Sequence, residues 1–401
     1  MNAIKTAAVI GGGIAGPVAA LALRKAGIDA TVYEAYQDTA DGIGGTLMVA
    51  PNGLAALKIV GIDLDPVGQP IQGMVMTDWR GKRLGEFGGV SGLPPSRVMW
   101  RGELYQAVRE QVAELGVPTV YGKRLVGAEE TPVGVTARFA DGTEASADIL
   151  IGADGIRSVV RPLIDPSAPG PQYTGLIGFG ALSKAEVPGA RSDAMYFAFG
   201  KQAFLGYWPV PDGGTAWFCN LTQEKFVTAA ETWATPRAEW MRILREKFAD
   251  DVPGRDLLLG TEADDLLTFG GMEILPSVPR WHRGRMVLVG DSAHAPSSSS
   301  GQGASLAAES AIQLARCLRD LPDVGSAFTA FERLRRERVE KVAAQAAKTN
   351  NQKSMGPVAT TLMSLLMPLA SRTFMKPEKL IGWTHRYRID WDEPVTVGGG
   401  D

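Results

Sequence analysis

Short apolar runs alternate with helical spacing at the start of the chain, and glycines separate them. Residues 4–10 (IKTAAVI) predict a buried strand, and residues 15–26 predict a helix that Gly27 ends. Residues 29–34 (DATVYE) predict the next strand. This order is a βαβ unit, whose parallel strands require helices on both faces of the sheet.

Weaker patterns follow this unit. The glycine-rich stretch 42–51 predicts a loop leading into a short strand, and apolar residues at helical spacing predict a helix over 101–115. Residues 119–139 predict strands of a small antiparallel layer, with a hairpin turn at Asp141-Gly142. Residues 148–151 predict a return to a buried strand.

Aromatic and small residues alternate over 171–280, which predicts a mainly antiparallel sheet with one inserted helix over 237–249. The pattern then predicts a strand over 285–289, an amphipathic helix over 303–318 and a long helix over 325–350. The predicted fold class is therefore α/β: a Rossmann-like domain, interrupted by a mainly antiparallel β-sheet domain, with C-terminal helices.

Composition and charge exclude several classes of protein. The formal net charge is -3 and the densest charge run, 333–341, mixes both signs, so we expect no nucleic-acid partner. Cys219 and Cys317 form neither a disulfide framework nor a metal-type spacing, so we expect a cytoplasmic location and no metal. The opening residues, MNAIKTAAVIGGG, show no separate apolar h-region and no cleavage site, so we expect no signal peptide. The apolar stretch 357–370 is too short to span a bilayer and predicts a packed helix instead of a membrane-surface segment.

The first candidate site is the sequence GGGIAG at residues 11–16, which contains G-x-G-x-x-G between the first strand and the first helix. Gly11 permits a tight turn, Gly13 lets a pyrophosphate approach the backbone, and Gly16 lets the helix pack close to the strand. Glu34, at the end of the second strand, can accept hydrogen bonds from ribose hydroxyls and argues against a 2′-phosphate. The motif predicts dinucleotide binding without distinguishing NAD from FAD.

Two later segments share one arrangement. Residues 152–161 (GADGIRSVVR) and 284–305 (GRMVLVGDSAHAPSSSSGQGAS) each place an acidic residue, Asp154 or Asp291, directly after a buried β segment. Either one alone is compatible with a turn or a helix N-cap. Both together, in this order after the glycine motif, favour FAD over NAD.

With these three motifs, the chain resembles the group A flavoprotein monooxygenases, the para-hydroxybenzoate-hydroxylase-like family, from residue 6 to residue 350. That family includes phenol, salicylate and polyketide hydroxylases and tetracycline-inactivating enzymes. The resemblance implies an FAD-dependent monooxygenase that hydroxylates an aromatic or polycyclic small molecule. It implies FAD contacts from the following residues: Gly11, Gly13, Ile14, Ala15, Gly16, Glu34, Ala35, Arg101, Leu125, Asp154, Asp291, Pro296, Gly301, Gly303, Ala304 and Ser305.

The resemblance gives several of these residues a role. Asp291 would hydrogen-bond the ribityl chain, and residues 301–305 would begin a helix whose dipole stabilises negative charge on the flavin pyrimidine ring. Asp154-Gly155 matches the family's shared FAD and nicotinamide motif. Arg101 would pair with the FAD pyrophosphate through its guanidinium fork, and an ordinary surface helix residue is the alternative. Leu125 would contact adenine through its backbone.

The chain departs from the family pattern in the flavin loop and in the helix after it. Residues 297–300 (SSSS) replace a loop richer in proline and glycine, and Glu309-Ser310 stands where an acidic pair or Asp-Ala is common. His294 also lies in this loop. We favour a structural role for it over a catalytic one, because the family chemistry needs no base there. We assign no catalytic residue.

The resemblance also implies a reaction sequence and its partners. NADH or NADPH reduces FAD and leaves, and the reduced flavin reacts with O2 to give the C4a-hydroperoxide, which hydroxylates an electron-rich carbon. The single G-x-G-x-x-G predicts no separate nicotinamide domain, so NAD(P)H would dock transiently in a surface cleft. Some aromatic residues of 171–280 are expected to line a pocket for the substrate where the two domains meet. We expect a monomer or a weak dimer.

The predicted domains follow from this organisation. Residues 1–170 would form the first part of the FAD-binding domain and 171–280 a β-rich substrate-binding domain. Residues 281–350 would form the second part of the FAD-binding domain, and 351–401 a C-terminal helical segment.

Four other interpretations are left open by the motifs. An FAD oxidase or reductase would share all three. A flavin-dependent halogenase typically carries a W-x-W-x-I-P segment, which residues 207–211 (YWPVP) do not match. A non-catalytic binder with the same fold is disfavoured by the intact motifs. An NAD-dependent dehydrogenase would explain only the first motif.

Overall fold

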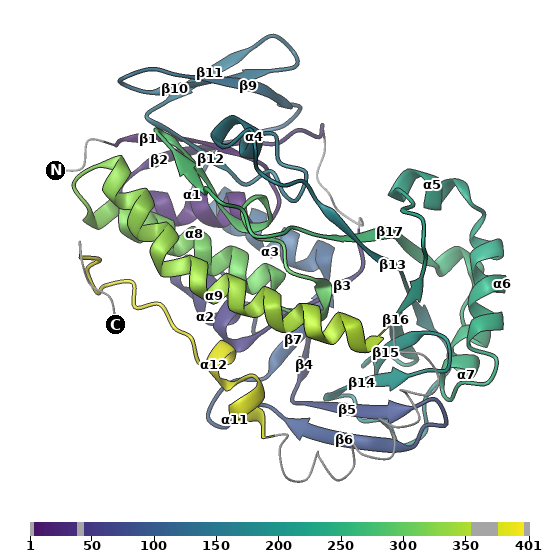
Figure 1. The fold of residues 1–401 in the computed structure, drawn as a ribbon. Helices are drawn as coiled ribbons and strands as arrows, with labels where there is room; N and C mark the ends of the chain where they lie inside the picture. Colours follow the sequence, from purple (N-terminus) through teal and green to yellow (C-terminus); the bar gives the residue numbers. More distant parts are fainter. Residues whose placement is uncertain (1–3, 38–43, 354–375, 397–401) are drawn as a thin grey trace.

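The described part of the chain folds into four β-sheets, and the parallel one contains the predicted βαβ unit (Figure 1). The computed structural model describes residues 4–37, 44–353 and 376–396. In the unit, β1 (Thr6–Ile10) leads through α1 (Ala15–Lys25) to β2 (Asp29–Tyr33), and β1 and β2 pair in parallel. The α/β fold class and its Rossmann-like core are therefore confirmed.

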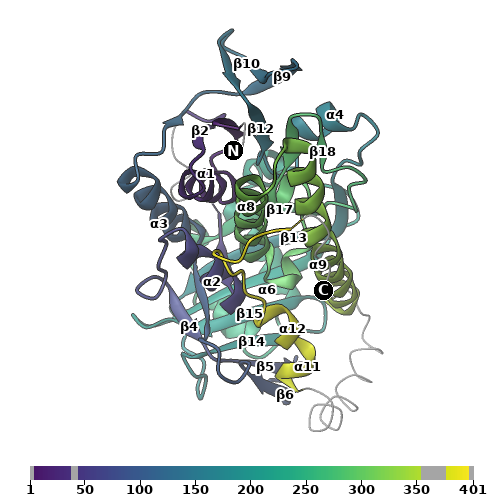
Figure 2. The same cartoon turned by 90° about the vertical axis from the view of Figure 1, so that its left-hand side faces the viewer.

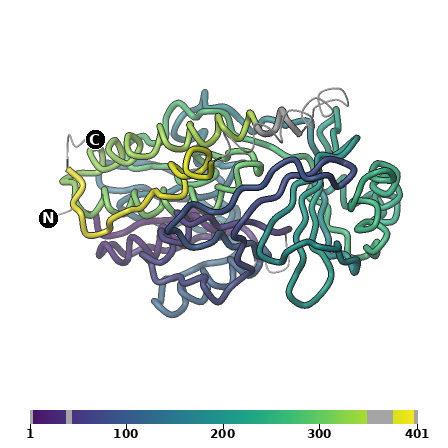
Figure 3. Tube along the Cα trace, turned by 90° about the horizontal axis from the view of Figure 1, so that it is seen from below, coloured from purple at the N-terminus to yellow at the C-terminus, as the bar shows by residue number. Residues whose placement is uncertain are grey.

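Strands from far along the chain complete this six-stranded sheet, whose order is β18-β19-β12-β1-β2-β8. β12 (Ile149–Gly152) pairs in parallel with β1 on one side and with β19 (Met286–Leu288) on the other. β18 (His282–Arg283) is antiparallel to β19, and β8 (Thr119–Val120) is parallel to β2. Residues that follow the β-rich region thus return to the N-terminal sheet. Figure 3 shows these late segments beside the N-terminal ones at one end of the molecule.

Helices cover the parallel sheet, as its buried strands require. α8 (Gly303–Asp320) packs between α1 and α9 (Val324–Lys353), and α2 (Pro51–Ile59) also packs on α8 (Figures 1 and 2). α3 (Arg101–Glu114) lies against α1. The alanine-rich α1 is almost wholly buried, because its small side chains allow the sheet and α8 to approach closely on both sides.

A three-stranded antiparallel sheet extends from the parallel one at the top of Figure 1. It contains β9 (Leu125–Glu130), β10 (Val135–Phe139) and β11 (Glu144–Ala147). The expectation that residues 119–139 lie wholly in this layer is wrong for β8. The N–H of Glu34 donates to the carbonyl of Val120 at 2.9 Å, so β8 is held at the edge of the parallel sheet instead.

A seven-stranded, mainly antiparallel sheet forms the other large layer, in the order β17-β13-β16-β15-β14-β5-β6. Most of its strands come from the aromatic region: β13 (Gln172–Ser183), β14 (Ala194–Phe199), β15 (Phe204–Pro209), β16 (Thr215–Thr222) and β17 (Leu267–Ile274). Two come from an earlier segment, β5 (Gly73–Asp78) and β6 (Arg83–Gly88), and β5 pairs in parallel with β14. The sequence pattern did not indicate these two strands.

Helices cover the outer face of this sheet around a second hydrophobic core. The predicted helix is α6 (Arg237–Lys247), and it is flanked by α5 (Ala229–Ala234) and α7 (Gly254–Leu259), so the expectation of one helix is wrong in number. Pro236 and Pro253 separate the three, because proline is favoured at a helix start and disrupts a helix interior.

A small sheet connects the two large layers. It contains β3 (Thr46–Val49), β7 (Ser96–Trp100) and β4 (Gln69–Ile71), with β7 in the middle. The remaining helices are α4 (Val160–Ile164), α11 (Pro377–Leu380) and α12 (Gly382–His385). The helix predicted over 357–370 lies outside the described residues. Across the described segments, no helix is both long and apolar enough to cross a membrane.

Candidate active site

The glycine motif forms a tight turn between β1 and α1 that is open on one side. Gly11 has a φ of 110°, and a Cβ there would collide with the carbonyl oxygen of Ala153. A Cβ on Gly16 would collide with the Gly11 carbonyl oxygen, so only glycine fits. At Gly13 the nearest atom to an added Cβ is the Tyr105 hydroxyl at 4.0 Å. This turn therefore leaves space for a ligand beside Gly13.

The first turn of α1 faces the same space. Ile14 is the N-cap residue, and no side chain caps the helix, which begins at Ala15. The first N–H groups of a helix have no partners within the helix and carry a partial positive charge. This terminus can therefore receive an anion such as a pyrophosphate.

Glu34 is anchored to this turn at the end of β2. Its Oε2 accepts a hydrogen bond of 2.6 Å from the N–H of Gly12, and its Oε1 accepts one of 2.9 Å from Tyr36. The half-buried carboxylate keeps further lone pairs for a ligand hydroxyl. Ala35 follows it, half-buried, at the same edge of the sheet.

Arg101 begins α3 and contacts Tyr105, whose hydroxyl borders the space beside Gly13, which we call the groove. Its Nε–H donates to the Tyr105 hydroxyl at 2.7 Å, while the side chain remains exposed. The pKa of Tyr105 is raised, first by desolvation and also by the charges of Asp291 and Glu34, against the lowering effect of Arg101. Tyr105 therefore lies where these three charged residues meet. Sequence reasoning missed it, although its position four residues after Arg101 places both on one helix face.

Asp291 lies just beyond β19, in the short 3-10 helix η2 (Gly290–Ser292). Its side chain is exposed, yet the surrounding protein desolvates the carboxylate and raises its pKa, against the opposing charge of Arg101. The carboxylate is thus open to a ligand although protein atoms surround it. Gly290 has a φ of 63°, and a Cβ there would lie 2.6 Å from the Cβ of Ala15, so this segment touches the glycine motif.

Asp154 has a local structural role. Its carboxylate accepts hydrogen bonds from the Ser158 hydroxyl at 2.5 Å and from the N–H groups of Val159 and Val160 at 2.7 and 3.1 Å. It therefore holds the turn that leads into α4, which was the alternative interpretation of this residue. Desolvation raises its pKa, and these hydrogen bonds oppose that shift.

The three motifs nevertheless converge. The contact between Gly11 and Ala153 joins the first to the second, and the contact between Gly290 and Ala15 joins the first to the third. Arg161 joins the second to the third, since its guanidinium donates to the Ser292 carbonyl at 3.1 Å. Segments more than a hundred residues apart thus surround one groove.

The N-terminus of α8 completes the site. Gly301, with a φ of 58°, turns the chain into Gln302, and the helix begins at Gly303 and Ala304 with no side-chain cap. Ser305 is fully buried and faces α2 instead of the open end, since its hydroxyl accepts from the Ala50 N–H at 3.3 Å.

Leu125 and Pro296, two of the predicted FAD contacts, lie outside the glycine turn and the helix N-termini. Leu125 begins β9 with its side chain buried in the main core, opposite Phe139. Close to it in the chain, the Lys123 N–H donates to the Glu34 carbonyl at 2.7 Å. Pro296 is half-buried in the loop that follows η2.

His294 is turned away from the groove into the protein. Its Nε2 pairs with the Ser310 hydroxyl at 2.9 Å, and burial together with the charge of Arg335 lowers its pKa to about 3. The imidazole is therefore neutral at ordinary pH. These contacts support the structural role.

Glu309 is the centre of a buried charged network behind the start of α8. It accepts hydrogen bonds from Arg335 at 2.7 Å and from Arg338 at 2.8 Å, and Glu309 and Arg335 are fully buried. The amide nitrogen of Asn52 donates to Glu309 at 2.7 Å and to Gln302 at 2.9 Å. The network thus connects α9 through Glu309 to the residue that precedes α8.

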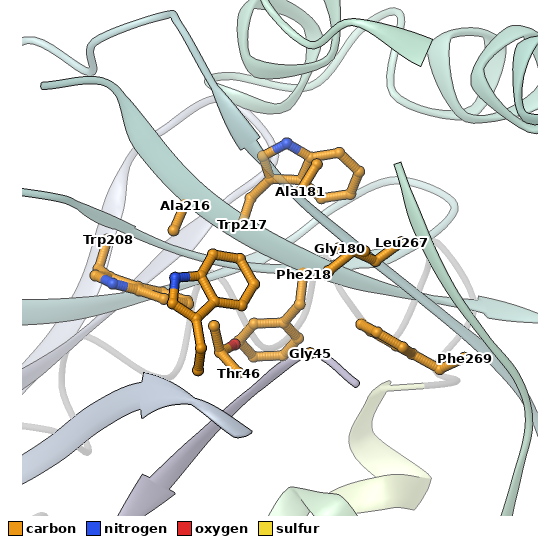
Figure 4. Close-up of a pocket in the computed structure, with 11 residues that line it drawn as sticks. Gly45, Thr46, Gly180, Ala181, Trp208, Ala216, Trp217, Phe218, Leu267 and Phe269 are labelled. Atoms are coloured by element: carbon orange, nitrogen blue, oxygen red, sulfur yellow. The ribbon is translucent and has the colours of Figure 1, made fainter. Parts of the chain in front are cut away.

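An aromatic slot opens where the small sheet faces the inner surface of the seven-stranded sheet. Its walls include Trp100, Trp208, Phe218 and Phe269, with the Gly45–Thr46 backbone opposite. Figure 4 shows the Phe218 and Phe269 rings between the strands of the large sheet and this backbone. The slot lies where the predicted domains meet, as a substrate pocket should.

Comparison with known proteins decides the class. The model of the FAD binding domain family matches residues 5–346, which is most of the chain. The chain belongs to this family. The family expected from the three motifs is thereby confirmed.

Relatives in the FAD binding domain family are monooxygenases. The chain is 33% identical over 324 residues to the FAD-dependent urate hydroxylase of Klebsiella pneumoniae, covering 78% of this chain and 81% of that protein. It is 29% identical over 327 residues to the aurachin C monooxygenase/isomerase of Stigmatella aurantiaca, covering 78% and 80%. The expectation of an FAD-dependent monooxygenase is confirmed.

A solved structure gives the same result for the fold. The crystal structure of Klebsiella pneumoniae HpxO complexed with FAD and uric acid superposes with a TM-score of 0.81 at 26% identity, covering 95% of this chain and 96% of that one.

The groove fits FAD chemically. The open side of the glycine turn and the uncapped first turn of α1 present N–H groups to a pyrophosphate, and Arg101 adds a cation beside them. The carboxylates of Glu34 and Asp291 supply acceptors for hydroxyl groups. Among the described residues, no group of three or more His, Cys, Asp or Glu side chains could hold a metal ion.

Proposed function

We propose that this FAD-dependent monooxygenase binds its flavin in the groove between α1, α3, η2 and α8, and hydroxylates an aromatic small molecule held in the aromatic slot. Residues 11–16 and Arg101 would receive the pyrophosphate, Glu34 the adenosine ribose, and Asp291 the ribityl chain. Pro296, Gly301, Gly303 and Ala304 would border the flavin ring. Ala35 and Leu125 would border the adenosine, and Asp154 and Ser305 would hold the groove's walls.

The chemistry that bound FAD would supply is acceptance of two electrons from NADH or NADPH and activation of O2, with one oxygen atom going to the substrate and the other leaving as water. The protein's own part is to orient and to exclude water. The uncapped N-terminus of α8 favours negative charge on a ring placed before it. The apolar slot keeps water from the reacting atoms, which limits loss of reducing equivalents to side reactions.

One observation carries the proposal: the three motifs meet at one groove, through Gly11 against Ala153 and Gly290 against Ala15. A groove assembled from three distant segments fits a long dinucleotide better than a local turn would. We also propose a monomer or weak dimer as the active species. The buried, unpaired thiols Cys219 and Cys317 support a cytoplasmic location.

The test is direct. The purified protein is expected to carry one FAD per chain and to oxidise NADH or NADPH faster when an aromatic substrate is present. Under isotopically labelled O2, the product should contain one labelled oxygen atom. Nicotinamide oxidation with unlabelled product would establish an oxidase or reductase instead, and a colourless protein that binds no added FAD would overturn the proposal.

A further inference from the structure

Large and small side chains alternate across the inner face of the seven-stranded sheet. Phe218 on β16 lies opposite Gly180 on β13 and opposite Gly206 on β15. A Cβ on Gly206 would collide with the Phe218 ring. The ring therefore leans over the strand beside it, and glycine makes room for it.

Phe269 lies flat in the same way at the edge strand β17. A Cβ on Gly180 would lie 3.3 Å from its ring, and a Cβ on Gly45 would collide with it from the opposite side. Phe269 and Trp100 are both partly exposed, whereas Trp208 is buried. Aromatic side chains thus line the slot from its buried end, at Trp208, to its exposed mouth, at Phe269 and Trp100. The slot is narrow because Gly45 and Gly180 let the backbone lie close to the Phe269 ring. Aromatic rings of this kind favour stacking with a flat ligand.

The described lining of the slot has neutral polar groups and no charged side chain. None of its described lining residues is charged, and Thr46 is the one lining residue there with a side-chain hydroxyl. The indole N–H of Trp217 is already used, since it donates to the Thr261 hydroxyl at 3.0 Å. Arg101 follows Trp100 in sequence, but its guanidinium is turned to Tyr105. A carboxylate in this slot would lose its water and find only neutral donors, the indole N–H groups of Trp100 and Trp208 and the Thr46 hydroxyl, with no lining cation to pair with, which is unfavourable.

We propose that the slot selects an uncharged, planar, fused-ring substrate and excludes anionic ones of the same shape. This inference rests on the proposed function and deepens it, because it assigns a charge class to the substrate of the same site. Phe269 is its specificity-determining residue at the mouth.

The test compares two naphthalenes of the same ring size. 2-Naphthol is neutral at pH 7 and 2-naphthoate is an anion, and calorimetric titration of the FAD-loaded, oxidised protein gives both dissociation constants. We expect 2-naphthol to bind at least about tenfold more tightly, since an unpaired buried charge costs more than the corresponding 1.4 kcal/mol. Equal or tighter binding of 2-naphthoate would overturn the inference, and so would failure of both molecules to bind.

A matched pair of variants adds a second measurement. Phe269→Arg places a cation at the mouth of the slot and should reduce or reverse the preference for 2-naphthol. Val133→Arg places the same cation on an exposed residue between β9 and β10, 79% accessible, and should leave the preference unchanged. Retained FAD shows that each variant is folded. If the wild-type protein binds no FAD, the proposed function fails; if it binds FAD and prefers the anion, this inference alone fails.

Discussion

The carboxylate of Glu34 accepts a hydrogen bond of 2.6 Å from the backbone N–H of Gly12. This contact ties the end of β2 to the glycine turn that follows β1. A Cβ on Gly12 would lie 2.9 Å from the Glu34 Oε2 atom, so a larger residue at that position would require the Glu34 side chain to shift. The residue proposed to hold the ribose therefore also shapes the turn proposed to hold the pyrophosphate.

Glu34→Gln should weaken FAD binding without unfolding the protein. The side chain keeps its shape but loses the negative charge that strengthens its hydrogen bonds to Gly12 and to a ribose hydroxyl. Charged hydrogen bonds are worth about 1.5–3 kcal/mol, so the dissociation constant should rise about tenfold to a hundredfold. Flavin fluorescence titration of the apoprotein measures it. Glu129→Gln, an exposed change on β9, is the control, and an unchanged constant for both variants would remove Glu34 from the site.

Gly16→Ala should weaken FAD binding, whereas Gly27→Ala should leave it unchanged. The added Cβ at Gly16 meets the Gly11 carbonyl oxygen, so the backbone of the turn must move, and we expect a loss of about 1–3 kcal/mol of stability together with weak FAD binding. Gly27 has a φ of 81° and open space around it, so alanine there costs about 1–2 kcal/mol of backbone strain and leaves FAD binding intact. Urea unfolding and FAD titration separate the two effects. Normal FAD affinity in Gly16→Ala would contradict the close-packing argument.

Arg335→Met should be strongly destabilising. Arg335 and Glu309 are fully buried and 2.7 Å apart, and the change leaves the buried Glu309 carboxylate with Arg338 as its remaining cation, at a cost of about 1.5–3 kcal/mol for the lost charged hydrogen bond. Arg242→Met removes an exposed arginine that pairs with Glu239 and Glu246 on α6, and should change stability little. Urea unfolding at neutral pH measures both. Equal losses of unfolding free energy in Arg335→Met and Arg242→Met would show that the buried network does not hold α8 and α9 together.

Acid should destabilise the protein partly through His294. Burial and the charge of Arg335 hold its pKa at about 3 in the folded protein, below the ordinary value of 6.5. Between these values the unfolded chain binds a proton that the folded protein does not, so stability falls as pH drops below 6.5, by up to about 1.4 kcal/mol per pH unit. His294→Gln should flatten this decline between pH 6.5 and 4.5, measured as free energies of urea unfolding. His385, whose pKa burial also lowers to about 4, would retain its share in the variant. If the unfolding free energy of His294→Gln fell with pH as steeply as that of the wild type, His294 would have an ordinary pKa in the folded protein, and this prediction would be wrong.

Much of the fold follows from local pattern. The strand, glycine turn and helix of residues 6–25 were predictable, because strand and helix periodicity and the steric need for glycine act over a few residues. The inserted antiparallel sheet, α6, α8 and α9 were predictable for the same reason. β5, β6, α5 and α7 were not, since short segments carry little periodicity and β5 owes its place to pairing with β14, more than a hundred residues later.

The sequence by itself determined which segments carry the chemistry: the glycine turn with Glu34, and the acidic residues that follow two later strands. Only the tertiary structure decided how each residue is used. It turned the carboxylate of Asp154 inward to hold a helix start, left the Asp291 carboxylate accessible among surrounding protein atoms, and placed Tyr105 near the charges of Arg101, Asp291 and Glu34. It also set glycines against phenylalanines from other strands to form the slot. The reason is physical: glycine and acidic motifs act through local geometry, whereas desolvation, ion pairing and ring packing depend on neighbours that only folding brings together.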